Sequence, residues 1–420
     1  MSRGSSFVHF YLLIGKKRTL RCGWLAAGVT ALAVGLICGC GGGGAQGKLL
    51  YAVGPGNSEV AMFAVSGSSE LTPVGTPVST GEGPDAIAID PLHRFAYIVD
   101  AASGIGPGGV SQYVVSSKSG ALVAATFSST IGSGGIAPAA ETGTNPVAIA
   151  IDVTVTYVFV ANQGSDSISV FMIDLIGCAG ICGNGTLTEI KQPPSVPLPP
   201  NCVASSSEPC PLSIAPASPT GLATTGNMLF VATSTAGAGA VSTYTFDSST
   251  GVITTPAAST TALVGFNPSA MTMDATAKFL FLTDTVDSEV QVVSIGNSGQ
   301  LTPVGTPVPT GPMPLNAWIS PSGNFLYTAN QGGADCANGG LSAFSVSSGV
   351  LTALSGSPFA AGPCPSYVIT DSSGSFLFVA NGGNNNTITV FTIDSSGAPE
   401  EPGTASPSIV INPTVLATNN

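Results

Sequence analysis

After residue 47 the chain contains one histidine and one arginine, and the two are neighbours. His93 and Arg94 lie in DPLHRF (90–95), a turn-like segment between two apolar runs. A general base must come within hydrogen-bond distance of its substrate, and a single histidine on a solvated turn has no evident partner. We therefore interpret both residues as surface residues first and as weak candidates for catalysis second.

Acidic and amide side chains recur where apolar runs end. Their oxygen atoms are ligands that a hard cation such as Ca²⁺ prefers. Asp and Asn at strand ends also make local turns, which is the commoner reason for their presence there. The candidates for a ligand or cation site are Glu82, Asp85, Asp100, Glu141, Asn162, Asp284, Asn330, Asp335 and Asn381. We expect no resident cofactor, with calcium as the alternative.

The charge of the chain restricts its partners. Its 420 residues include 10 Lys and Arg against 22 Asp and Glu, which gives a formal net charge of −12 at pH 7. Five of the basic residues precede residue 40, so the remainder is strongly acidic. Because phosphate contacts need basic patches, we expect no nucleic-acid partner. A charged fraction of 8 % with 44 % hydrophobic residues also excludes a charged disordered tail.

The N-terminal segment has the pattern of an export signal. Basic residues within 16–21 precede an apolar run over 24–37, which is shorter than the roughly 20 residues of a membrane-spanning helix. The following ICGC (37–40) resembles the bacterial lipobox, in which Cys40 would carry the lipid. The glycines after Cys40 would form a flexible tether. A signal cut at another site, or an uncleaved anchor, is the alternative.

Six cysteines remain after the signal segment. An even number in an exported protein predicts three disulfides. The spacing of Cys178 and Cys182 would also suit a metal site, but export and the lack of a nearby histidine make zinc the weaker alternative. The six residues are Cys178, Cys182, Cys202, Cys210, Cys336 and Cys364.

The rest of the chain repeats one unit. LTPVGTPVST (71–80) and LTPVGTPVPT (301–310) nearly coincide, although they lie far apart. An apolar aromatic run that ends in a small polar residue also recurs, and each copy follows a proline-led alternating strand. Alternation rich in Val, Ile, Thr and Phe predicts β-structure throughout. The runs are FAYIVD (95–100), YVFVAN (157–162), MLFVAT (228–233), FLFLTD (279–284), FLYTAN (325–330) and FLFVAN (376–381).

Four strands in each repeat of about 50 residues are typical of a β-propeller blade. The last proline-led strand, NPTVLAT (412–418), has no blade after it, whereas KLLYAV (48–53) has no first strand before it. We predict an all-β, seven-bladed propeller of four-stranded blades, in which 412–418 is the innermost strand of the first blade. An aspartate recurs directly after several of the first strands and predicts a turn there. These residues are Asp90, Asp152, Asp274 and Asp371.

The predicted domain organisation has three parts. These are a lipoprotein signal peptide at 1–39, a lipidated cysteine with its Gly-rich tether at 40–47, and the propeller at 48–420 with a Pro-rich, cysteine-containing insertion at about 191–219.

The repeats resemble a known family. FVAN (159–162), YTAN (327–330) and FVAN (378–381), each preceded by a proline-led strand, resemble the YVTN repeat. Residues 48–418 as a whole resemble the lactonase-type seven-bladed propellers, whose best-known activity is 6-phosphogluconolactonase. The resemblance implies a cluster of His, Arg and Glu side chains at one mouth of the central channel.

The blade frame places several residues on opposite faces of the ring. Cys336 follows a second strand and Cys364 precedes a first strand, so both lie on one face and can pair. His93 and Arg94 lie between a first and a second strand, on the other face. This chain therefore departs from the family's catalytic pattern.

Because catalytic side chains are scarce, we expect a binding or scaffold module rather than an enzyme. It would be tethered by lipid in the bacterial cell envelope, on the periplasmic or cell-surface side. Its partners would be the membrane and an unidentified protein or carbohydrate, and the protein would be monomeric. The alternatives are a lactonase that hydrolyses a sugar lactone and a structural component of a surface layer.

The lipid anchor is directly testable. Replacing Cys40 with serine removes the acylated thiol and should release the protein from the membrane fraction into the soluble one. Fractionation followed by immunoblotting measures this. A variant that stays in the membrane with its N-terminal segment intact would identify an uncleaved anchor instead.

Overall fold

The structure is a computed structural model, and it describes residues 48–102, 106–124, 140–175, 185–191, 212–213, 218–235, 238–333, 335–382, 386–400 and 412–419. The chain divides into two compact units, Met1–Gly42 and Gly43–Asn420. The predicted signal peptide, Cys40 and the tether lie outside the described residues. Every described element belongs to the second unit and is a β-strand. Within this part of the chain, no helix has the length and apolar character needed to span a membrane.

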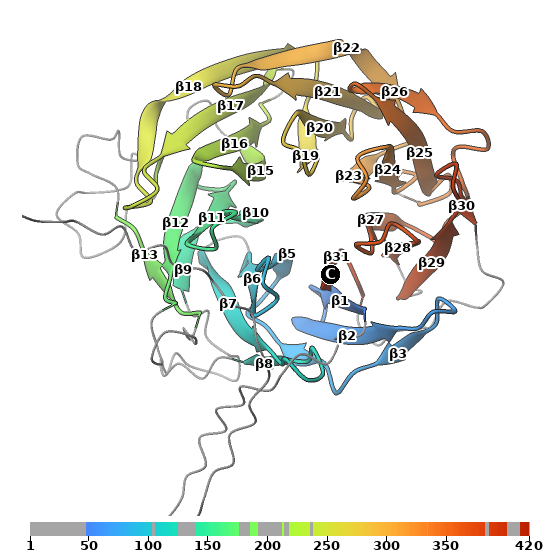
Figure 1. The fold of residues 1–420 in the computed structure, drawn as a ribbon, viewed down its shortest axis with the longest axis horizontal. Coiled ribbons are helices and arrows are strands. Elements are labelled where there is room, and N and C mark those ends of the chain that lie inside the picture. The colour runs from blue at the N-terminus through green and yellow to red at the C-terminus, as the bar shows by residue number, and fades with distance from the viewer. Residues whose placement is uncertain are drawn as a thin grey trace, which may run out of the picture. The chain divides into compact units, whose positions relative to one another are not determined.

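The strands form seven antiparallel sheets that surround one axis as the blades of a propeller (Figure 1). The innermost, or first, strands are β31 (Val415–Asn419), β5 (Pro84–Ile89), β10 (Pro146–Ile151), β15 (Pro219–Thr225), β19 (Pro268–Met273), β23 (Pro314–Ile319) and β27 (Pro365–Thr370). The second strands, in the same order of blades 1 to 7, are β1 (Leu49–Gly54), β6 (Phe95–Asp100), β11 (Tyr157–Asn162), β16 (Met228–Thr233), β20 (Phe279–Asp284), β24 (Phe325–Asn330) and β28 (Phe376–Asn381).

The outer half of each blade is less regular. The third strands are β2 (Glu59–Val65), β7 (Pro107–Val115), β12 (Ser167–Ile173), β17 (Ala238–Phe246), β21 (Glu289–Ile295), β25 (Gly340–Ser347) and β29 (Thr387–Ile393). In blades 1 to 3 the outermost position is occupied by two short strands, β3 (Leu71–Pro73) and β4 (Val78–Ser79), β8 (Leu122–Ala124) and β9 (Ala140–Thr144), and β13 (Leu187–Glu189) and β14 (Leu212–Ser213). The other outermost strands are β18 (Ile253–Val264), β22 (Leu301–Pro309), β26 (Val350–Ala353) and β30 (Pro399–Glu400).

The core consists of hydrophobic clusters between neighbouring blades. One cluster joins Phe159 and Val170 of blade 3 to Leu229 and Tyr244 of blade 4. Because both faces of a blade are covered in this way, the second strands β6, β11 and β28 are buried at every residue. This explains why these strands read as continuous apolar runs in the sequence.

Buried tyrosines of the second strands form hydrogen bonds with the next blade in the ring. Their hydroxyl groups donate to backbone carbonyls in the hairpin between the third and fourth strands of the next blade. Gly397, one such acceptor, has a φ of 83°, and a Cβ there would lie 2.2 Å from the ring of Phe325, so the turn requires glycine. The pairs are Tyr51 with Gly120 at 2.8 Å, Tyr97 with Gly185 at 2.9 Å and Tyr327 with Gly397 at 2.9 Å.

The ring closes as the sequence predicts. β31 pairs antiparallel with β1 along its whole length and lies between β27 and β5 around the centre (Figure 1). The backbone N–H of Leu49 donates to Oδ1 of Asn419 at 2.6 Å, and Lys48 forms an ion pair with Asp371 of blade 7. The prediction that segment 412–418 supplies the innermost strand of the first blade is therefore confirmed. The observed strand, β31, has slightly different bounds, Val415–Asn419.

The predicted Pro-rich insertion falls mostly outside the described residues. Only Leu212 and Ser213 within it form a described strand, β14, before β15 begins at Pro219. The cysteines Cys178, Cys182, Cys202 and Cys210 also lie outside the described residues, so their pairing stays a prediction.

Deleting residues 408–420 should strongly destabilise the propeller. The deletion removes β31 and uncovers Leu50 and Tyr51, which are both 0 % exposed. At about 25 cal/mol per Å², exposing even a few hundred Å² of apolar surface costs several kcal/mol, which is comparable with the stability of a whole domain. Thermal melting should show aggregation or a much lower Tm. Deleting residues 41–46 is the control, and equal melting of both deletions would contradict the closure.

Candidate functional site at the upper mouth of the channel

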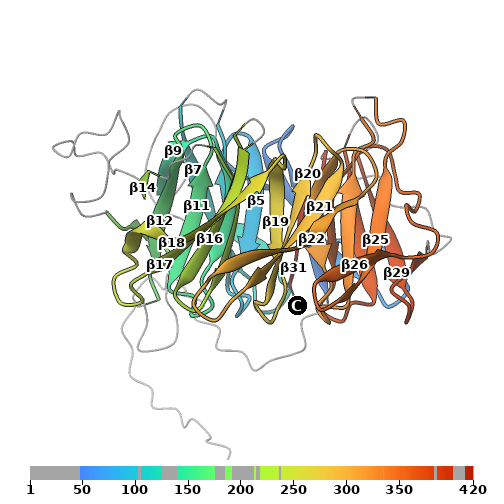
Figure 2. The same cartoon turned by 90° about the horizontal axis from the view of Figure 1, so that it is seen from above.

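All first strands begin at one face of the ring, here called the upper face, and end at the lower face; Figure 2 shows the strands running between the two faces. In blades 2 to 7 the first strand opens with a proline that pairs with the last residue of the second strand. A shift in register follows the proline in all six. Such a bulge re-aims the side chain of the residue after the proline.

These bulge residues, together with the residue after Pro413 in blade 1, surround the central axis of the ring at the upper face and are here called the mouth residues. Asp85 is exposed, and the others are partly exposed. Four carry a hydroxyl group and one carries a charge, so the mouth is mainly polar and uncharged. The mouth residues are Thr414, Asp85, Val147, Thr220, Ser269, Leu315 and Ser366.

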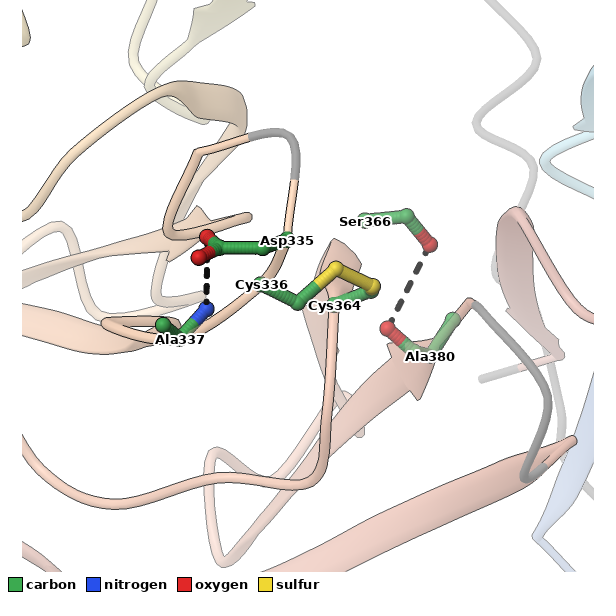
Figure 3. The surroundings of a disulfide bond; sticks show 6 residues. All are labelled: Asp335, Cys336, Ala337, Cys364, Ser366 and Ala380. Atoms are coloured by element: carbon green, nitrogen blue, oxygen red, sulfur yellow. Dashed lines mark hydrogen bonds between the residues drawn. A yellow bond between two sulfur atoms is a disulfide. The ribbon is translucent and has the colours of Figure 1, made fainter.

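The hydroxyl groups of the mouth differ in their partners. Ser269 Oγ donates to the carbonyl of Thr283 at 3.0 Å, and Ser366 Oγ donates to the carbonyl of Ala380 at 3.3 Å (Figure 3). By contrast, Oγ1 of Thr220 and Oγ1 of Thr414 have no hydrogen-bond partner within the described part of the chain. Both oxygen atoms are buried, so they are not presented to a ligand, and a buried hydroxyl group without a partner costs stability.

Asp85 is the one charged mouth residue. Its side chain is accessible to solvent, yet the surrounding protein displaces enough water to raise the pKa of its carboxyl above the ordinary value. A carboxylate with a raised pKa is a stronger base, and it accepts hydrogen bonds from ligand hydroxyls.

One aromatic side chain, Tyr367, lies next to the mouth, whereas Trp318 of the adjacent blade lies near the lower end of its strand. Trp318 of β23 donates from Nε1 to Thr370 Oγ1 at 3.0 Å and is partly buried. Tyr367 follows Ser366 and packs against the hydrophobic clusters on both sides of β31. Burial raises the pKa of Tyr367 to about 12.

The disulfide Cys336–Cys364 braces this side of the mouth and confirms one predicted pair. Cys336 lies in the loop between β24 and β25, and Cys364 immediately precedes β27, so the bond joins blade 6 to blade 7 (Figure 3). The Cα atoms are 4.9 Å apart, within the usual range. Cys364 also accepts a backbone hydrogen bond from Gly382 at 2.8 Å. The disulfide and this hydrogen bond both hold Cys364 in place. They therefore fix the start of β27, which carries Ser366 and Tyr367.

Five of the candidates from the sequence lie beneath this surface. They end the second strands, are at most 2 % exposed and bond within their own blades. Asp284 accepts from the backbone N–H groups of Val286 at 2.8 Å and Asn267 at 2.5 Å. Their role toward a ligand or cation stays a prediction. The other contacts are Ser111 Oγ to Asp100 at 2.6 Å, Asn162 to Ser169 at 3.0 Å, Asn330 to Ser342 at 2.8 Å and Asn381 to Thr389 at 2.8 Å.

A glycine three residues before the proline covers four of these polar groups, all except Asp284. A Cβ at Gly81 would lie 2.6 Å from the carboxyl of Asp100, and one at Gly311 would lie 2.7 Å from the amide of Asn330. The N–H of Gly81 also donates to Ser111 Oγ at 3.0 Å. The link between blades therefore passes directly over the strand end, which requires glycine.

The remaining candidates on the upper face are exposed. Glu82, Glu141 and Asp335 are accessible to solvent. Among the residues that the structure describes, no group of three His, Cys, Asp or Glu side chains could hold a metal ion. The calcium alternative stays a prediction.

His93 and Arg94 lie on the lower face, as predicted. His93 has a φ of 53° in its turn, and Arg94 Nε donates to Asp90 Oδ2 at 3.0 Å. Asp90 also accepts from the backbone N–H of Phe95 at 2.7 Å. Asp152, Asp274 and Asp371 make the same kind of turn, which confirms that interpretation of the series.

The sequence reasoning missed the hydroxyl-bearing mouth residues and the aromatic side chain next to them. Tyr367, Thr220, Ser269, Ser366 and Thr414 were not among its candidates. The available signal was the proline that opens each first strand, because the residue after it occupies one equivalent position in every blade.

The fold and its channel define a seven-bladed β-propeller. A family model described as "Lactonase, 7-bladed beta-propeller" matches residues 206–316 and 296–407, which confirms the resemblance to the lactonase-type propellers. No curated protein matches the chain.

Several solved structures share the fold. A protein from Lactobacillus plantarum is 17 % identical, with a TM-score of 0.66 over 90 % of this chain and 100 % of its own. A putative 6-phosphogluconolactonase from Bacteroides fragilis is 18 % identical, with a TM-score of 0.65 over 89 % and 98 %. A periplasmic gluconolactonase from Pseudomonas aeruginosa is 19 % identical, with a TM-score of 0.63 over 88 % and 98 %. At these identities the likeness shows the fold.

Replacing Asp100 with asparagine should stabilise the protein at high pH. Burial raises the pKa of Asp100 to about 7 from 3.8, so the wild type loses stability as pH rises through this range. The amide has no such loss and can bond to Ser111 as Asn330 bonds to Ser342.

Denaturant unfolding should show Asp100→Asn more stable than wild type by up to a few kcal/mol at pH 8, with a smaller difference at pH 5. The reverse exchange, Asn330→Asp, is the matched control and should lose stability as pH rises. A pH-independent effect of both variants would contradict a buried, titrating Asp100.

Proposed function

We propose that this propeller binds a sugar lactone or a closely related polyhydroxylated compound at its upper mouth. The observation that carries the proposal is the ring of hydroxyl groups around a single carboxylate, Asp85. Sugar hydroxyls donate to a carboxylate and exchange hydrogen bonds with serine and threonine hydroxyls, which four of the mouth residues carry. The apolar face of a sugar ring packs well on an aromatic side chain such as Tyr367.

Hydrolysis of the bound lactone is a second candidate, and the lactonase family match favours it. Asp85 is the one carboxylate among the mouth residues, and its raised pKa suits a general base that activates water. Two of the structural neighbours carry gluconolactonase-type descriptions, which support the same reaction class.

The location in the cell envelope also remains a proposal. The N-terminal basic and apolar segment and the ICGC sequence support export with a lipid anchor at Cys40. The similar Pseudomonas aeruginosa protein is described as periplasmic, which agrees with that compartment. In this setting the ligand would be a compound that reaches the envelope.

Asp85→Asn should abolish most of the activity. If Asp85 is the base, its loss lowers kcat by about 100-fold or more, and the wild-type rate falls as pH drops below the raised pKa. Hydrolysis of glucono-δ-lactone, followed by pH-stat and corrected for the spontaneous rate, measures both effects. Calorimetric titration with the sugar alcohol sorbitol measures binding without reaction.

Asp287→Asn is the control, because Asp287 is exposed on the upper face but is not a mouth residue. If the wild type binds the ligand but does not hydrolyse the lactone, the hydrolase function is wrong and the binding function stands. Equal affinity and equal rate in Asp85→Asn and wild type would place the site elsewhere.

A further inference from the structure

Four of the five cationic side chains of the propeller lie on the lower face. Lys48 precedes the lower end of β1, Arg94 and Lys278 lie in turns between first and second strands, and Lys118 lies in the hairpin between β7 and β8. All of these positions are on the lower face. The fifth, Lys191, follows β13 on the outer edge of blade 3 at about mid-height, because the neighbouring Ile190 N–H donates to the carbonyl of Val170 in the middle of β12. The sequence has no other Lys or Arg after residue 47, so the segments outside the described residues add none.

Carboxylates, in contrast, are spread over the upper face. They lie at the upper ends of third strands, in the loops between second and third strands and in the links between blades. None of them has a Lys or Arg partner among the described residues, because the two ion pairs there are Lys48–Asp371 and Arg94–Asp90. The partly or fully exposed carboxylates of this face are Glu59, Glu82, Asp85, Glu141, Asp166, Asp287, Glu289 and Asp335.

We propose that this mouth selects an uncharged ligand and discriminates against its phosphorylated or carboxylated counterpart. The inference rests on the proposed function, and it names the charge class of the ligand at that site. Phosphate and carboxylate groups are recognised by Arg, Lys or clustered N–H donors, and the described upper face offers no cation. A surface of one charge sign also lowers the local concentration of ions with the same sign.

The same field acts on the products of hydrolysis. Water adds to the lactone carbonyl, the ring C–O ester bond breaks, and the ring oxygen leaves as a hydroxyl after taking up a proton. The resulting carboxylic acid loses its proton to solvent near neutral pH. An uncharged substrate thus becomes an anion beside Asp85, and repulsion favours its release. Product inhibition by the hydroxy acid should therefore be weak.

The test compares glucono-δ-lactone with its 6-phosphate on the full-length protein in detergent. Hydrolysis above the spontaneous rate gives kcat/KM for each lactone, and calorimetry with sorbitol and sorbitol 6-phosphate gives binding without reaction. We expect at least tenfold weaker binding and lower kcat/KM for the phosphorylated compounds at low salt. The ratio should shrink as the ionic strength rises, because about 0.1 M salt screens charges beyond roughly 10 Å.

A pair of lysine substitutions separates the local field from net charge. Glu82→Lys places a cation in the link beside Asp85, whereas Asn324→Lys places one in the exposed lower turn where blade 5 has Lys278. Glu82→Lys should improve the relative binding of the phosphorylated compound at least threefold. Asn324→Lys should leave the ratio unchanged.

The outcomes distinguish this inference from the proposed function. If neither the neutral nor the phosphorylated compounds bind or react, the proposed function is wrong and the inference fails with it. If both bind equally well, or the phosphorylated one binds better, the proposed function stands and the charge selection is wrong. An equal response to both lysine variants would also overturn it, because selection would then depend on net charge alone.

Discussion

The packing of each blade against its two neighbours is the interaction on which the rest of the structure depends. A four-stranded sheet that is apolar on both faces cannot bury itself, so only a closed ring leaves no apolar face open. Ring closure is most evident in blade 1, because its innermost strand comes from the opposite end of the chain from its other strands. β31 therefore completes the core and, through Thr414, also completes the mouth.

Closure by equivalent blades places seven equivalent positions around one channel. The proline at the start of each first strand lacks an N–H, and the register shifts directly after it. The residue before the proline often has a positive φ, as at Asn145, Met313 and Cys364. This local geometry directs the next side chain to the channel. The mouth is thus a product of the repeat, and its chemistry depends on which residue each blade places there.

The sequence was sufficient for the blades, the closing strand and the Cys336–Cys364 pair, because hydrophobic alternation and turn residues are local signals that repeat. It was insufficient for the strand-end polar residues. Asp100 and Asn330 look like mouth ligands in a linear pattern, but Gly81 and Gly311 bring the links between blades over them. The position of such a link is a tertiary feature. The bulge after the proline also interrupts the alternation of side chains along the strand. That alternation is the pattern from which one infers on which face of the sheet a side chain lies.

A binding site also requires that the sevenfold equivalence be broken, and the mouth residues break it in one arc. Blades 7, 1 and 2 are consecutive and present Ser366, Thr414 and Asp85, whereas the blades on either side present Leu315 and Val147. Tyr367 packs against the clusters that flank β31, in the middle of this arc. The disulfide holds the same arc at its blade 7 end. A polar ligand with one apolar face would therefore bind off the axis, against the closing strand, because that arc supplies both hydroxyl groups and the single carboxylate.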